Sequence, residues 1–330
     1  MAIISHSDIK RFKRCRRKFQ WASRLGRYLR PKQVVPAFYL GSAVHHALEV
    51  YYGEGEDPVE AVKEWCADKL EEFEEDYNIT SDKREELEED RDLAVGMLEH
   101  YEGWAPTVDS DYFSEVVETE MEGTVDIPGT DHEFRYIVDG LAKDYMGLYW
   151  VMEHKTAKRM QTDHLDQDEQ ILKYIWAVQK DLDIEVAGVI YTILKKKTPN
   201  EPRILKDGSL STAKNQSVTY EAYKEAVKDH HDGDIPEKYK ETLQHFKKKG
   251  NRFFFRDNIT RSQEEIREAE ERIVKEAKDM TENPRIYPNP TKACSYDCSY
   301  TTPCRLKSLG QDYEAELSKN FEEKERDEDE

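Results

Sequence analysis

The stretch that decides the fold is YWVMEHKTAK, residues 149–158, an apolar run that ends with Glu153 and Lys155. Its aromatic and β-branched residues favour a strand. Because successive side chains of a strand alternate between two faces, Glu153 and Lys155 share a face with Val151, while His154 takes the other face. The pattern therefore predicts a carboxylate and an ammonium group that address one spot at the end of a strand.

The preceding strand, within FRYIVDG at residues 134–140, is expected to end at Asp139. The connection around residues 144–147 is short enough for a hairpin, so we expect Asp139 to lie near Glu153. Two neighbouring carboxylates repel each other unless a proton or a cation intervenes, and hard oxygen ligands suit Mg²⁺ or Mn²⁺. With Lys155 beside them, these groups have the chemistry to hydrolyse phosphodiesters. A Glu-x-Lys tripeptide alone is weaker evidence, because charged proteins also carry it by chance on solvated edge strands.

Further β-rich runs surround this hairpin and predict an α/β fold. Residues 112–127, 132–144, 148–156 and 184–197 are typical of strands, and residues 163–182, between the last two, are typical of a helix. Three consecutive strands, a helix and a fourth strand predict a central mixed sheet of about four to five strands flanked by helices.

The rest of the chain is mostly helical. We expect one domain over residues 1–310, with a helical front end at 1–110, the core at 111–200 and a helical segment at 201–310. An acidic tail at 311–330 is expected to be disordered. The expected helices outside the core cover 5–23 (capped by Ser5 or Ser7), 39–52, 58–77, 81–104, 219–231, 236–249 and 262–280, with a short strand at 253–256.

The charge is unevenly distributed. Fifty Lys and Arg against seventy Asp and Glu give a formal net charge of −20, which argues against a general nucleic-acid coat. Residues 10–32 nevertheless carry eleven Lys and Arg, and no acid occurs between Asp8 and Glu49. This favours a polyanion-binding face over an ordinary solvated helix face. The expected phosphate contacts are Arg14, Arg16, Arg17 and Lys18, with residues 195–197 as weaker candidates.

The sequence excludes several classes of protein. No apolar run approaches the roughly 18 residues that a membrane span needs. The start of the chain lacks the apolar core of a signal peptide, so we expect a cytoplasmic protein. The phosphate-binding loop of ATP-driven motors is missing as well, so such a motor would be another chain.

Five cysteines in such a chain do not suggest disulfides. Three of them cluster as Cys294-x3-Cys298-x5-Cys304, and Cys15 stands alone in the basic segment. This layout fits one four-thiolate site, with either zinc or an iron–sulfur cluster, that joins the two ends of the chain. Cys66 is expected to be a small packing residue.

The ordered motifs GSAVHHALE, YIVDG, VMEHKTA and QILKY resemble RecB-type nucleases of the PD-(D/E)xK superfamily, over residues 5–305. The resemblance implies a restriction-endonuclease-like core, with Lys155 as the catalytic lysine. It implies that one or two Mg²⁺ or Mn²⁺ ions are held by His45, Asp139, Glu153 and the backbone carbonyl of His154. Gln170 and Tyr174 would face the bound strand. His46 is a competing ligand, and Glu49 is a candidate partner of His45.

The cysteine layout resembles the iron–sulfur branch of these nucleases, which includes AddB-type and CRISPR-associated four-cysteine exonucleases. That resemblance implies a [4Fe-4S] cluster on Cys15, Cys294, Cys298 and Cys304, with zinc as the alternative. We therefore expect a metal-dependent deoxyribonuclease that acts as an exonuclease on single-stranded DNA ends, with a helicase or recombination partner. The alternatives are a structure-selective endonuclease and a non-catalytic DNA-binding or adaptor subunit of a recombination or CRISPR adaptation complex.

Overall fold

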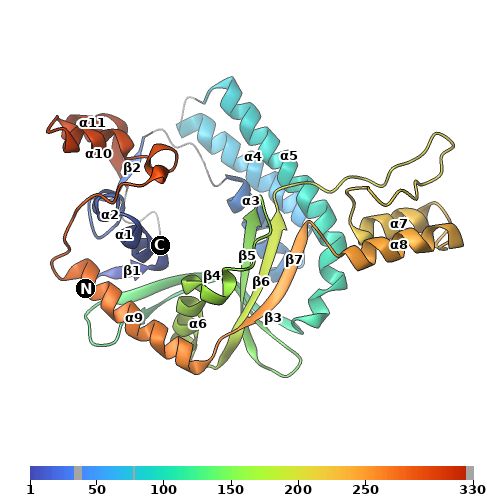
Figure 1. The fold of residues 1–330 in the computed structure, drawn as a ribbon, viewed down its shortest axis with the longest axis horizontal. Coiled ribbons are helices and arrows are strands. Elements are labelled where there is room, and N and C mark those ends of the chain that lie inside the picture. Colours follow the sequence, from blue (N-terminus) through green and yellow to red (C-terminus); the bar gives the residue numbers. More distant parts are fainter. Residues whose placement is uncertain (33–38, 77–78, 325–330) are drawn as a thin grey trace.

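The computed structural model describes residues 1–32, 39–76 and 79–324, and Figure 1 shows its elements. The strands are β1 (Ile3–Ser5), β2 (Leu29–Pro31), β3 (Glu115–Asp126), β4 (Glu133–Lys143), β5 (Tyr149–Ala157), β6 (Val186–Lys195), β7 (Phe254–Thr260) and β8 (Phe321–Glu323). The α-helices are α1 (His6–Arg14), α2 (Arg16–Ala22), α3 (Tyr39–Gly53), α4 (Pro58–Asp76), α5 (Ser81–Trp104), α6 (Glu169–Leu182), α7 (Tyr220–Asp229), α8 (Glu237–Lys249), α9 (Gln263–Thr281), α10 (Thr301–Ser308) and α11 (Tyr313–Asn320). Within these described ranges, no helix combines the length and apolarity needed to cross a membrane.

A mixed sheet of six strands forms the centre of the described structure. β3 runs antiparallel along one edge of β4, and the other edge of β4 is shared by the parallel β1 and the antiparallel β5. β6 is parallel to β5, and β7 is antiparallel to β6. The predicted mixed sheet is confirmed. It gains the three-residue β1, and its last strand is longer than the short one expected at residues 253–256.

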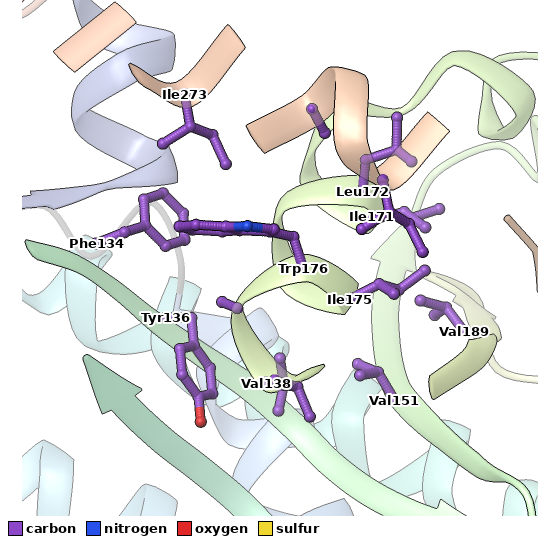
Figure 2. Close-up of a cluster of buried hydrophobic side chains, with 14 of the residues drawn as sticks. Phe134, Tyr136, Val138, Val151, Ile171, Leu172, Ile175, Trp176, Val189 and Ile273 are labelled. Atoms are coloured by element: carbon purple, nitrogen blue, oxygen red, sulfur yellow. The ribbon is translucent and has the colours of Figure 1, made fainter. Parts of the chain in front are cut away.

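Two helices, α6 and α9, cover one face of the sheet (Figures 1 and 2). On α6 the buried Ile171, Ile175 and Val178 follow one another at the spacing of a single helical stripe. They join the core cluster that contains Phe134 of β4 and Val151 of β5. An amphipathic helix laid on an alternating sheet therefore builds this core.

The opposite face of the sheet packs against α3 and α5. Leu194 and Phe254 belong to the apolar cluster of these helices. Trp150 and Met152 of β5 join a smaller cluster with Phe113. The alternation predicted for residues 149–155 is thus confirmed, with Val151 on one side of the sheet and Met152 on the other.

The basic N-terminal segment forms two helices rather than the single helix predicted from residue 5 to residue 23. Ser5 begins α1 with a capping box to Asp8, and Cys15 interrupts the helix in an extended conformation, with φ −163° and ψ 111°. The C-terminal segment supplies partners at the break. The backbone N–H of Arg17 donates to the carbonyl of Tyr287 at 3.1 Å. These long-range partners replace the local helical hydrogen bonds, and sequence periodicity cannot show them.

The predicted disordered tail at 311–330 is wrong for its described part. α11 and β8 lie within residues 311–324, and β8 pairs antiparallel with β2 near the other end of the chain. Leu317 and Phe321, four residues apart, are buried against Trp21 and Tyr300. These two apolar anchors outweigh the acidic composition of the segment. Residues 325–330 lie outside the described part of the chain.

Distant acids neutralise much of the basic segment. Lys13 forms ion pairs with Glu169 at 2.8 Å and Glu276 at 2.7 Å, both far along the chain. Further ion pairs join Arg14 to Asp297, Arg27 to Glu314 and Arg30 to Glu322. The lack of local acids therefore does not leave the segment unpaired, and only part of its charge is available to a polyanion.

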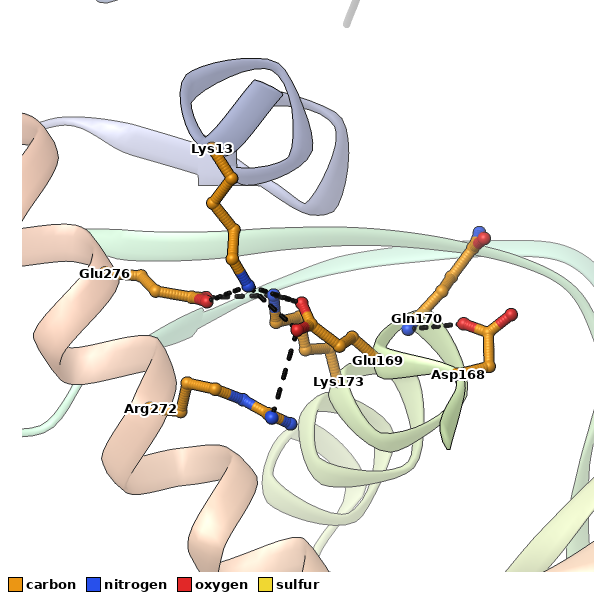
Figure 3. A network of polar contacts seen from close by, with 7 residues as sticks. All are labelled: Lys13, Asp168, Glu169, Gln170, Lys173, Arg272 and Glu276. Carbon is orange, nitrogen blue, oxygen red and sulfur yellow. Dashed lines mark hydrogen bonds and ion pairs between the residues drawn. The ribbon is translucent and has the colours of Figure 1, made fainter. Parts of the chain in front are cut away.

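Lys173 on α6 completes this polar network (Figure 3). It is fully buried, and its Nζ lies 2.9 Å from Glu276 and 3.4 Å from Glu169. Arg272 of α9 approaches Glu169 to 3.9 Å. Because a buried charge is tolerated only when it is paired, the network fixes how α1, α6 and α9 meet.

Candidate metal centre

The sheet divides at Asp139. β4 continues past this residue to Lys143, so the prediction that its strand ends at Asp139 is wrong. Pairing between β4 and β5 covers only Gly140 to Lys143, and it stops opposite Met152. Just beyond, the backbone N–H of His154 donates to the Asp139 carboxylate. The side chain of Asp139 thus fills the gap that opens between the two strands.

His45 on α3 is the histidine that reaches this gap. Its Nδ1 lies 3.0 Å from Oδ1 of Asp139. His46 instead lies 3.3 Å from Glu49 and stacks near Trp65. The structure therefore favours His45 over His46, and it corrects the expected partner of Glu49, which is His46.

The pKa values of Asp139 and Glu153 shift in opposite directions in this environment. Burial would raise the pKa of Asp139, but the hydrogen bond and charge of His45 outweigh it and hold that pKa at about 2. Burial and the neighbouring Asp139 charge raise the pKa of Glu153 to about 7, although Lys155 opposes the shift. Such separation of two carboxyl pKa values is typical of functional sites.

Lys155 forms an ion pair with Glu153, as the shared face predicts. Burial acts to lower the pKa of Lys155, but the Glu153 charge and hydrogen bond raise it above its usual value. Lys155 therefore stays protonated over the neutral range. In this form it is a donor and an electrostatic partner, not a base.

Glu120 is a member of the site that the sequence did not reveal. His45, Glu120 and Asp139 each offer a ligand atom, and these atoms lie within 4.8 Å of one another. Burial, then the charge of Asp139, raises the pKa of Glu120 to about 7. On β3 it is one of several acids at alternating positions, so neither its type nor its spacing marks it out.

The backbone conformation of Glu120 is a second indication of a functional position. Its φ is +47° in the middle of a strand, where a side-chain-bearing residue costs about 1–2 kcal/mol. Neither Glu120 nor Asp139 appears in the regular register that pairs their neighbours on β3 and β4. Strained backbone of this kind clusters at functional sites.

Gln170 and Tyr174 lie together at the start of α6. Nε2 of Gln170 donates to the Tyr174 hydroxyl at 2.9 Å, as their spacing of one helical turn predicts. Burial and the nearby Glu153 charge raise the pKa of Tyr174 to about 12. Tyr174 is therefore close to the Glu153 side of the site, and its hydroxyl is neutral.

The side chain of His154 lies on the opposite face of β5. Its ring stacks on Tyr52, with centroids 5.6 Å apart and planes at 9°. The buried Arg256 donates to the Tyr52 hydroxyl at 2.6 Å and pairs with Asp109. Burial lowers the pKa of His154 to about 3, so its ring is neutral and forms a packed wall. A metal-ligand role for its backbone carbonyl stays a prediction.

Three of the four predicted phosphate contacts are engaged within the chain. Arg14 pairs with Asp297 at 2.7 Å, Arg16 lies 4.4 Å from the Phe12 ring, and Arg17 donates to the Cys304 carbonyl at 3.3 Å. Lys18 differs, because it lines a surface cavity.

The expected cluster ligands occupy adjoining segments. All four are partly exposed: Cys15, Cys294, Cys298 and Cys304. The N–H of Asn289 points to Sγ of Cys15 at 3.5 Å, and Arg17 points to Sγ of Cys304 at 3.4 Å. No three of these sulfurs come within 4.8 Å of one another, in the part of the chain that the structure describes. Thiolates about 2.3 Å from a single zinc ion would be closer together.

Comparisons with known proteins identify the family of this chain. No curated protein is similar enough to this chain to count as a match. A solved structure, "Crystal structure of SSO0001", shares 13% identity over 81% of this chain and 85% of that chain, with a TM-score of 0.29. The family model of the PD-(D/E)XK nuclease superfamily matches residues 3–305, which include the divided sheet, His45 and the Glu153–Lys155 pair. The chain belongs to the PD-(D/E)XK nuclease superfamily.

Proposed function

We propose that this protein is a divalent-metal-dependent exonuclease that hydrolyses phosphodiester bonds at single-stranded DNA ends. The observation that carries the proposal is the convergence of His45, Asp139 and Glu120 at the gap in the sheet, next to the Glu153–Lys155 pair. Membership of the superfamily gives the coarser function, a metal-dependent nuclease.

The donor set fits a hard divalent ion. Carboxylate oxygens and one imidazole nitrogen are ligands that Mg²⁺ and Mn²⁺ accept. The carboxyl groups of Glu120 and Glu153 have pKa values near 7, so their deprotonation at neutral pH is less favourable than in water. A bound cation would stabilise both carboxylates. We propose His45, Asp139, Glu153 and the His154 carbonyl as ligands, with Glu120 added from the structure.

Each residue then has a distinct role. A divalent ion supplies Lewis acidity toward a phosphoryl oxygen. Lys155, kept protonated by Glu153, stabilises negative charge that develops on the phosphate. His45 orients Asp139 through their 3.0 Å contact. Gln170 and Tyr174 are proposed to position the substrate from α6.

We propose an iron–sulfur cluster on Cys15, Cys294, Cys298 and Cys304. Support comes from the convergence of both chain ends and from N–H groups aimed at three of the sulfurs, those of Cys15, Cys294 and Cys304. Its role would be structural, because it would fasten the basic helices to the C-terminal segment. Zinc is the alternative.

Cleavage of labelled single strands tests the function. With Mn²⁺, linear DNA should yield mononucleotides or short oligomers, circular DNA should stay intact, and EDTA should stop the reaction. Cut circles would indicate an endonuclease, and no products under any condition would indicate an adaptor subunit. A helicase or recombination partner in the cytoplasm would suit the exonuclease.

A further inference from the structure

The segment between β6 and β7, residues 196–252, forms a basic lobe on an acidic protein. It carries thirteen Lys and Arg against nine Asp and Glu, a formal net charge of +4 on a chain whose net charge is −20. Its helices α7 and α8 lie outside the sheet, with α7 against α5 (Figure 1), and they enclose an apolar cluster of their own. Because a locally positive surface attracts polyanions, the lobe is a candidate for contact with the substrate.

A small polar pocket of about 80 Å³ lies in this lobe. The end of α8, the residues just before β7 and the segment 215–218 form its walls. Its charged residues are Lys249 and Arg252, and no described residue of its lining is acidic. The side chains of Asn215 and Ser217 add neutral hydrogen-bond donors. Two cations and two neutral donors around a small cavity are groups that can bind a phosphate.

The fold does not use the two cations of the pocket. Within residues 1–32, 39–76 and 79–324, the side chains of Lys249 and Arg252 form no hydrogen bond or ion pair, and both residues are exposed. By contrast, Lys214 of the same lobe pairs with Glu241 at 2.5 Å. A lysine in the last turn of a helix also interacts favourably with the carbonyl end of that helix. Arg252 lies beyond α8, so this interaction does not account for its position.

The pocket lies near the end of the sheet that carries Lys155. Ala157 of β5 is in register with Lys195 of β6. The backbone N–H of Lys195 donates at 2.8 Å to the carbonyl of Phe253, which lines the pocket. Two strand spacings of about 4.8 Å and two residues of about 3.3 Å along the strand therefore place the backbones of Phe253 and Lys155 about 12 Å apart.

Lys195 lies between the pocket and the metal centre. On β6 it shares the side of Tyr191, four residues earlier, which packs in the core cluster under α6. Lys155 addresses the same side, because its charge acts on the hydroxyl of Tyr191. Lys196 is different, since its charge acts on Asp90 of α5. The route from the pocket to Lys155 therefore passes a further cation on the same side of the sheet.

We propose that this pocket binds a phosphate group of the single strand and anchors the strand on the lobe, from which it passes Lys195 to the metal centre. The inference rests on the proposed nuclease function and adds a defined anchor for its substrate. The ligand is a phosphodiester inside the strand. A terminal phosphate shares its chemistry, and the experiment separates the two sources.

Binding can be measured without cleavage. Fluorescence anisotropy in EDTA, with a single-stranded DNA oligomer that is labelled on a base and lacks a terminal phosphate, gives Kd over a range of salt concentrations. Lys249→Gln and Arg252→Gln each remove one charge from the pocket. Lys206→Gln is the matched control, because Lys206 is exposed in the same lobe but does not line the pocket. Circular dichroism melts check that every variant is folded.

Each pocket variant should weaken binding about fivefold and flatten the slope of log K against log salt by about 0.7, the value for one lost phosphate contact on a single strand. Lys206→Gln should change neither. Slopes equal to that of the control would overturn the inference. A loss of affinity confined to oligomers that carry a terminal phosphate would also overturn it, because the pocket would then bind the end of the strand.

The two proposals fail in different ways. If the wild-type protein degrades DNA with Mn²⁺ while both pocket variants bind like the control, the pocket inference is wrong and the nuclease function stands. If cleavage is absent but the pocket variants still lose strand binding, the function is wrong and the pocket remains a strand-binding site.

Discussion

At the scale of single residues, some members of the candidate site could be predicted from the sequence and one could not. Asp139, Glu153 and Lys155 follow from strand alternation, and the structure places them at one gap. Glu120 could not be predicted, because its inclusion depends on a left-handed φ in the middle of β3. Sequence alternation assumes regular strands, and this site forms where two strands depart from regularity.

Glu120 should contribute to metal affinity. Glu120→Gln keeps the shape of the side chain but removes a charge, so Mn²⁺ should bind about 10- to 100-fold more weakly. Because the pKa of Glu120 is about 7, Mn²⁺ must displace a proton at pH 6 but much less often at pH 8. The rise in Tm on adding Mn²⁺ should thus be larger at pH 8 in the wild type, and this difference should shrink in Glu120→Gln. Glu118→Gln, exposed on the same strand, is the control, and an identical response of both variants would refute the role.

Lys155 should act on chemistry rather than on folding. Lys155→Ala removes the proposed charge stabilisation, so cleavage of single strands should fall by at least about 10²-fold while Mn²⁺ still binds. Lys158→Ala removes an exposed lysine three residues later and should keep full activity. Full activity of Lys155→Ala would show that the catalytic lysine lies elsewhere.

At the scale of elements, local patterns predicted most helices and strands but not their long-range interruptions. The mixed sheet, α5 and the capping box of α9 agree with the sequence patterns. The break at Cys15 and the helix α11 do not, because both depend on partners about 270 to 300 residues away along the chain. The hydrophobic periodicity of a sequence indicates which face of a helix or strand is apolar, but it does not indicate which distant segment packs against that face.

The polar network between α1, α6 and α9 should matter for stability. Lys173→Ala would leave Glu276 buried without one of its partners, at a cost of about 3 kcal/mol. Lys173→Met paired with Glu276→Leu should recover much of that loss, because two apolar side chains need no partner. Urea unfolding measures both. Equal destabilisation by the single and double variants would show that the cost lies in packing rather than in the unpaired charge.

Glu169 gives the same network a dependence on pH. Although burial opposes it, hydrogen bonding to Lys13 and the charge of Lys173 lower its pKa from 4.5 to about 2. A carboxyl group with a lowered pKa stabilises the fold above its unfolded value, and this contribution is lost as pH falls from about 4.5 to about 2. Tm measured over this range should drop more steeply in the wild type than in Glu169→Gln. Glu268→Gln, exposed on α9, should follow the wild type, and parallel curves for all three would contradict the assignment.

At the scale of the whole molecule, the two ends of the chain form one unit. Strand β2 pairs with β8, and Arg14 pairs with Asp297 beside the expected cluster ligands. The spacing of the cysteines predicted that the two ends of the chain lie together at a four-cysteine site. The structure brings the ends together through a strand pair and an ion pair.

The cluster proposal concerns this unit. Purified protein should contain iron and labile sulfide and be brown, and Cys298→Ser should lose both the iron and the colour and lower Tm. Cys66→Ser changes a buried cysteine outside the set and should keep the iron. Zinc without sulfide in the wild type would replace the cluster with the alternative metal.

The proposed function requires that a divalent ion is held where the sheet divides at Asp139. Isothermal titration of the metal-free protein with Mn²⁺ tests it most directly, with Asp139→Asn as the variant, which keeps the size of the side chain. We expect one or two bound ions per chain in the wild type and loss of that binding in Asp139→Asn. Equal Mn²⁺ affinity in the two proteins would contradict it.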